Sequence, residues 1–129
     1  MHIILGDRIS EKPDSTYSLM ISSGEIVEAF DLNNQGITYK VALDQFSKKV
    51  NYISTDDLNF ETEEGLKVGT TFKDAQNKTN SKLSLEVGFA YILQLDSGWN
   101  AAFIEDSLKL LNKLDDNITI KFFFKRESN

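Results

Sequence analysis

Apolar and polar residues alternate over much of the chain, and this period of two predicts β-strands. Residues 37–43 alternate in this way, and residues 26–32 before them are rich in apolar side chains. The sequence Asn-Asn-Gln-Gly separates the two segments at residues 33–36. Because Asn and Gly tolerate a positive φ, the pattern predicts a β-hairpin within residues 25–43, with one face buried.

The longest alternation lies in the second half of the chain. Residues 85–95 carry an apolar side chain at every second position, which predicts one strand of eleven residues. Residues 99–103 and 118–124 are predicted to form the next and the last strand, and a shorter strand is expected to begin at Val50. The core is expected to contain these residues of the alternating segments: Tyr39, Val41, Val87, Phe89, Tyr91, Phe103, Ile120 and Phe122.

Two helices are predicted beside the strands. Residues 105–114 begin with acidic side chains, which suit the positive end of the helix dipole, and continue with a broad apolar stripe. A second, shorter helix is expected after Gly69, because the hydroxyl of Thr71 can accept a hydrogen bond from its first turn. The stripe of the first helix is expected to pack on the sheet through Leu108, Leu111 and Leu114.

These elements predict an α+β fold. We expect a largely antiparallel, twisted sheet of about seven or eight strands, with two helices packed on one face. The chain is short enough to form a single domain over residues 1–129.

An internal repeat is suggested by matching segments in the two halves, 1–66 and 67–129. The matches are residues 4–11 with 67–74, residues 18–21 with 84–87, and Gly36 with Gly98. Each match is offset by about half of the chain, as a duplication would predict. The alternative is that two stretches of similar secondary structure share this residue pattern by chance.

The composition excludes several classes of protein. The 129 residues contain no Cys, and His2 is the only His, which excludes a disulfide scaffold, a thiolate zinc site, a Cys nucleophile and a His-based triad. The net charge of −6 disfavours binding to nucleic acid or to anionic lipid. No apolar run approaches the roughly 20 residues that a membrane-spanning helix needs.

Carboxylates are the most abundant candidates for chemistry. The segment 56–64 carries five acidic residues and no basic one, but an EF-hand that began at Asp57 would need Gly and Glu where Thr62 and Val68 stand. A weak calcium site is the minor alternative there. Lys67 precedes Gly69, although a phosphate-binding loop requires the opposite order. We therefore expect no catalytic residue, no cofactor and no metal site.

The predicted last strand carries the candidate partner-binding residues. Phe123 lies between Lys121 and Lys125 on the face opposite the expected core, and an exposed aromatic ring between cations is a plausible protein contact. The alternative is that a helix covers Phe123 while the Lys stems extend outward. Acidic residues for electrostatic steering of a partner are expected at Asp56, Asp57 and Glu61.

Homodimer formation is a further expectation. An apolar strand close to either terminus, at residues 3–5 or 118–124, could pair with a second copy if it lay at an edge of the sheet. The face around Phe123 is the other candidate for contact between two copies.

The segment 65–75, with Gly69, Thr71 and Asp74 ahead of a short helix, resembles small exported bacterial domains. These are the small lipoprotein of the outer-membrane β-barrel assembly machine and the β-lactamase inhibitory protein, which is built from tandem copies. The resemblance implies a non-enzymatic protein-binding module of the cell envelope with no catalytic residue. Because an apolar strand is expected from residue 3 without a polar segment before it, we also expect an exported domain whose signal peptide has been removed. The alternative is a cytoplasmic, acidic inhibitor or immunity-type protein that masks a basic site on its partner.

Overall fold

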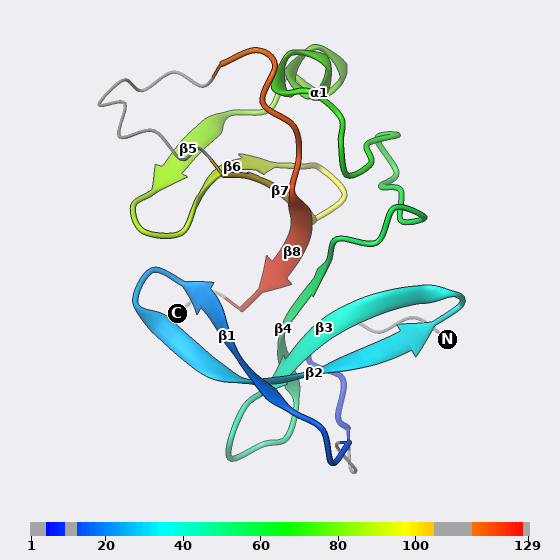
Figure 1. Cartoon of the computed structure of the whole chain (residues 1–129), viewed down its shortest axis with the longest axis vertical. Coiled ribbons are helices and arrows are strands. Elements are labelled where there is room, and N and C mark those ends of the chain that lie inside the picture. Colours follow the sequence, from blue (N-terminus) through cyan, green and yellow to red (C-terminus); the bar gives the residue numbers. More distant parts are fainter. Residues whose placement is uncertain (1–4, 10–12, 105–114, 128–129) are drawn as a thin grey trace.

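The computed structural model describes residues 5–9, 13–104 and 115–127, and its strands form one curved antiparallel sheet (Figure 1). The strand order is β1-β2-β3-β4-β8-β7-β6-β5. The strands are β1 (Tyr17–Ser22), β2 (Glu25–Asn34), β3 (Ile37–Leu43), β4 (Val50–Thr55), β5 (Leu83–Glu86), β6 (Ala90–Gln94), β7 (Asn100–Phe103) and β8 (Phe122–Arg126).

The sheet consists of two four-stranded meanders. Strands β1 to β4 pair in chain order, strands β5 to β8 do the same, and β4 pairs with β8 to join them. The segments that match in sequence occupy equivalent places: residues 18–21 lie in β1, residues 84–86 lie in β5, and Gly36 and Gly98 lie in the turns that follow β2 and β6. Two of the three matched pairs therefore occupy equivalent positions in the two meanders.

The predicted α+β class is wrong, because the fold is mostly β. In the described part of the chain the only helix is α1 (Phe72–Thr79). Its N-cap is the expected Thr71, whose Oγ1 accepts a hydrogen bond from the Asp74 amide at 3.2 Å. The predicted helix at residues 105–114, with Leu108, Leu111 and Leu114, lies outside the described residues.

Both faces of the curved sheet are apolar. The inner face carries a cluster that spans both meanders and includes Ala42, Tyr52, Ile92 and Phe124. The outer face of the second meander packs under α1, where Phe72 meets Phe103 edge to face at 5.5 Å between ring centroids. The outer face of the first meander holds a third cluster: Phe30, Val41, Val50 and Ile53.

The single strand predicted over residues 85–95 is wrong, because the chain reverses at residues 87–89 to form the β5–β6 hairpin. Gly88 adopts a φ of +82°, which supplies the left-handed residue that such a short connection needs. Val87, expected in the core, lies at the tip of this turn and is 75% exposed. Of the other expected core residues, Val41, Tyr91, Phe103 and Ile120 are buried, and Tyr39, Phe89 and Phe122 are partly buried.

Replacing Gly88 by Ala is expected to destabilise the fold by about 1–2 kcal/mol, because the left-handed backbone strains any β-carbon. A β-carbon there would also lie 3.1 Å from Ser23 Oγ. Gly36→Ala is the matched control, since Gly36 has the same φ of +82° and nothing within 4 Å of its β-carbon position. Urea denaturation should show the larger loss for Gly88→Ala. Equal losses would mean that the approach of Ser23 adds nothing.

Candidate functional site

Phe123 is covered while the two Lys side chains extend outward, as the alternative interpretation expected, although the cover is the loop after β4 and not a helix. The Phe123 side chain is fully buried (0% exposed) on the outer face, where its ring centroid lies 5.4 Å from that of Phe60. The chain after β4 crosses this face and brings Phe60 over Phe123. The two cations do remain accessible: Lys121 is exposed, and Lys125 extends over the Trp99 ring with Nζ 4.8 Å from the centroid.

The acidic candidates do not converge on one site. Asp57 accepts hydrogen bonds from the amides of Thr38 (3.0 Å) and Asn59 (2.9 Å), and these bonds lower the pKa of its carboxyl. Asp57 therefore shapes the loop after β4. Asp56 lines a groove on the inner face, and Glu61 is exposed elsewhere on the loop. Over residues 5–9, 13–104 and 115–127, no three acidic or His side chains are placed to hold a metal ion.

Edge pairing by the predicted last strand is also wrong, because β8 lies between β4 and β7 and has no free edge. Residues 3 and 4 of the other candidate lie outside the described part, and Leu5 belongs to a turn. The sheet ends at β1 and at β5 instead.

An apolar groove lies on the inner face, and we call it the inner groove. Its volume is about 250 Å³. Met20 and Ile104 border it and are 40% and 44% exposed. Phe89 and Phe122 meet edge to face within it, with ring centroids 6.1 Å apart. The full lining is Leu19, Met20, Lys40, Tyr52, Ser54, Asp56, Phe89, Ile104 and Phe122.

An ion-pair cluster on Arg126, which we call the Arg126 clasp, ties the two ends of the sheet together. The Arg126 guanidinium pairs with the Glu86 carboxylate of β5 and donates to the Ile21 carbonyl of β1 at 2.9 Å. The Ser23 amide, in the β1–β2 turn, donates to Glu86 at 2.8 Å. Partial burial raises the pKa of Glu86, but Arg126 and the Ser23 amide outweigh it and hold this pKa below its usual value.

The clasp also borders the aromatic inner face. The Arg126 guanidinium lies 5.1 Å from the Phe124 ring centroid and 5.2 Å from that of Phe89. Because Phe89 lines the inner groove as well, the clasp and the groove share a wall. The β1–β2 turn is held on the same side by a hydrogen bond of 2.5 Å from Ser23 Oγ to the Val87 carbonyl. The clasp thus positions β1 beside the groove.

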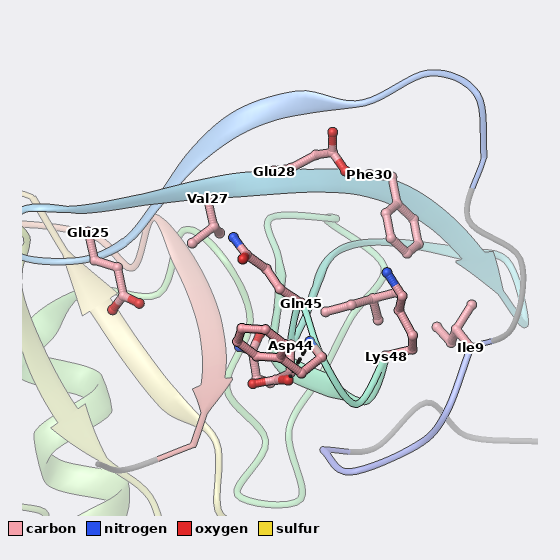
Figure 2. Close-up of a pocket in the computed structure, with 11 residues that line it drawn as sticks. Ile9, Glu25, Val27, Glu28, Phe30, Asp44, Gln45 and Lys48 are labelled. Carbon is pink, nitrogen blue, oxygen red and sulfur yellow. Dashed lines mark hydrogen bonds between the residues drawn. The ribbon is translucent and has the colours of Figure 1, made fainter.

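A second groove lies between β2 and the loop after β3 (Figure 2). Its volume is about 710 Å³, larger than that of the inner groove. Figure 2 shows Lys48 beside Phe30 and Ile9 at one end, with Glu25 at the other. The Asp44 carboxylate accepts the amides of Phe46 and Ser47, both at 2.9 Å. Although this groove is larger, we consider the inner groove the better candidate site. The charged residues of the larger groove are spread apart, and its lining has no cluster of aromatic rings.

Sequence reasoning missed the inner groove. Phe89 and Phe122 were expected in a closed core, and Met20 and Ile104 were not singled out. Periodicity identifies a buried face but does not distinguish a closed core from the floor of an open groove. The approach of β1 to Ile104 and Phe89, which creates the groove, depends on contacts between residues that are distant in sequence.

These features define a mostly β domain with a half-open, curved sheet and an apolar groove on its inner face. No family model matches the chain, and no curated protein matches it. A solved structure that is similar to this chain is titled the uncharacterized protein yfeY from Escherichia coli. The match has a TM-score of 0.43 and 8% sequence identity, and it covers 90% of this chain and 83% of that one. None of the described helices is long and apolar enough to cross a membrane.

Proposed function

We propose that this protein is a non-enzymatic domain that binds a protein partner through the inner groove. The observation that carries the proposal is the exposure of Met20 and Ile104 beside a floor of aromatic side chains. Clustered apolar side chains that remain accessible on a folded domain are typical of interaction surfaces. Aromatic side chains in a concave surface are also the residue type that contributes most to binding energy.

Four carboxylates outside the inner groove accept hydrogen bonds from backbone amides, which makes them poor candidates for general acids or bases. A general acid or base works best with a pKa near the working pH, whereas the carboxyls of Asp44, Asp57, Glu64 and Glu86 all have lowered pKa values. Hydrogen bonds to nearby amides contribute in each case. Glu64, for example, accepts the amide and the hydroxyl of Ser97 at 2.7 and 2.9 Å. These groups hold turns and loops together.

Selection of short random peptides on the full chain tests the proposal and does not require the natural partner. Peptides that bind the groove should lose at least about tenfold in affinity for the double variant Met20→Thr/Ile104→Thr, equivalent to about 1.4 kcal/mol. Both side chains are substantially exposed, so these changes should alter stability by less than about 0.5 kcal/mol each. Leu58→Thr is the matched control, because Leu58 is 70% exposed and lies outside the groove.

Calorimetric titration measures the affinity of the selected peptides for the wild type, for Met20→Thr/Ile104→Thr and for Leu58→Thr. Loss of affinity in the double variant alone supports the groove as the binding surface. Equal affinity for all three proteins, with circular dichroism showing the same fold, would contradict the proposal.

An acidic inhibitor that masks a basic partner site is the second candidate function. It is favoured by two segments, residues 13–39 and 50–66, that contain acidic residues but no Lys or Arg. Such a protein should attract its partner over a distance, so the association rate of basic selected peptides should fall steeply as salt is raised. A rate that does not change with salt would argue against this candidate.

A further inference from the structure

The strand β1 offers an unpaired backbone edge beside the inner groove. In the described part of the chain β1 has a single hydrogen-bonded neighbour, β2. Leu19 and Met20 of β1 line the groove. An unpaired edge of this kind presents backbone N–H and C=O groups that can pair with another strand. Here those groups lie next to an apolar surface that could receive the side chains of such a strand.

The usable part of the edge ends at Met20. The register between β1 and β2 shifts between Met20 and Ser22, so Ile21 forms an irregularity in the pairing. The Ile21 carbonyl is already occupied by the Arg126 guanidinium. Because irregularities of this kind terminate regular pairing, the stretch available for a further strand covers residues 17–20.

The hairpin that carries this edge is acidic, and Arg126, the cation bound to the Ile21 carbonyl of β1, is already paired with Glu86. The segment that contains β1 and β2, residues 13–39, carries Asp14, Glu25, Glu28 and Asp31 and no basic residue. Asp56 adds a further carboxylate in the groove, where Lys40 is the basic member of the lining. A strand with basic side chains would therefore be attracted to this edge, and an acidic strand would be repelled.

We propose that an extended segment of a partner protein, with alternating apolar and basic side chains, adds to the free edge of β1 as a further antiparallel or parallel strand. Its backbone pairs with residues 17–20, its apolar side chains rest on Tyr52, Phe89 and Phe122, and its basic side chains face the acidic hairpin. Strand addition draws affinity from the backbone and specificity from alternate side chains. This inference rests on the proposed function of the groove.

The other occupants fit less well. A second copy of this chain paired through β1 would bring two acidic hairpins together, which like-charge repulsion opposes. The edge of β5 is the other end of the sheet, but none of the residues of β5 lines the inner groove. Its Glu86 is also held in the Arg126 clasp. An added strand at β5 would gain backbone pairing without the apolar floor.

The test uses three synthetic probes with blocked ends: a Lys-Val alternating heptapeptide, the corresponding Glu-Val heptapeptide, and the Lys-Val peptide N-methylated at alternate residues. The Lys-Val peptide should bind at least about tenfold more tightly than either other peptide. N-methylation keeps the side chains but removes the donors needed for pairing. In hydrogen exchange followed by NMR, binding should slow the exchange of amides in residues 17–20 and leave β5 unchanged.

Three outcomes would overturn strand addition: equal binding of the N-methylated peptide, equal binding of the Glu-Val peptide, or protection of β5 instead of β1. Dimer formation through β1 at the same protein concentration, seen by sedimentation, would assign the edge to a second copy instead. The proposed function is tested separately by the Met20→Thr/Ile104→Thr variant with the selected peptides. Loss of their binding in that variant, without sensitivity to N-methylation, would retain the groove and reject strand addition.

Discussion

Phe123→Ala is expected to lower the free energy of unfolding by about 3–5 kcal/mol, as is typical when a buried aromatic side chain is removed from a core. Phe123 is fully buried in the cluster beneath α1 and the loop after β4. Its ring packs on Phe60, which in turn lies 4.9 Å from the Trp99 ring centroid. The substitution leaves a cavity bordered by aromatic side chains that are fixed by their own strands and loops.

Urea denaturation followed by Trp fluorescence and circular dichroism measures this loss. Val87→Ala is the informative control, because Val87 was expected in the core but is 75% exposed. Its substitution should change stability by less than about 0.5 kcal/mol. Lys121→Ala should be similarly neutral. A Phe123→Ala variant as stable as the wild type would contradict the packing of the outer face.

Arg126→Met is expected to cost about 2 kcal/mol, which is more than a surface ion pair contributes. The substitution removes the ion pair with Glu86, the hydrogen bond to the Ile21 carbonyl and the contacts with the rings of Phe89 and Phe124. It also leaves Glu86 partly buried without its cation. Methionine preserves most of the apolar stem, so the loss reports mainly on the polar contacts.

A double-mutant cycle with Glu86→Gln isolates the ion pair. If the two side chains interact directly, the double variant should be more stable than the sum of the single losses implies, by about 1 kcal/mol. Lys125→Met is the matched control, since Lys125 lies on the same strand but contacts Trp99 on the other face. Additive losses for Arg126 and Glu86 would show that the clasp does not act as a unit.

The clasp also predicts a pH dependence. The pKa of Glu86 in the folded protein is lower than its ordinary value of 4.5. The ionised carboxylate therefore stabilises the folded state at a pH above 4.5. This contribution is lost as the pH falls through the pKa of the folded state. The stability difference between wild type and Glu86→Gln should therefore be largest near neutral pH and shrink in acid. A difference that grew on acidification would contradict the sign of the shift.

The β2–β3 turn and the start of α1 could be predicted from the sequence, because interactions between neighbouring residues determine them. Positive φ angles at Gln35 and Gly36 form the turn that the Asn-Asn-Gln-Gly sequence predicts. Thr71 caps α1 through its own hydroxyl. The candidate site was less accessible to prediction. Asp56 was singled out and does line the inner groove, but the other members come from β1, β3, β4, β8, the end of β7 and the turn at Phe89.

The mistakes share a physical cause. Residues 85–95 keep their alternation through the turn at Gly88, because a tight hairpin can place apolar residues of both strands at regular intervals. Phe123 lies in a segment with the same period of two. This period shows that the two faces of the strand differ, but it does not show which face is covered by other parts of the chain. That decision depended on Phe60, which lies more than 60 residues earlier in the chain.

The amino-acid sequence by itself determined that the chain is rich in strands, where the β2–β3 hairpin turns and where α1 begins, because propensity, turn chemistry and capping act over a few residues. Only the tertiary structure decided that both faces of the sheet are buried, that β1 and β5 form its ends, and that an apolar groove opens beside β1. These features follow from the curvature of the whole sheet and from contacts such as Arg126 with Glu86, which no local pattern specifies.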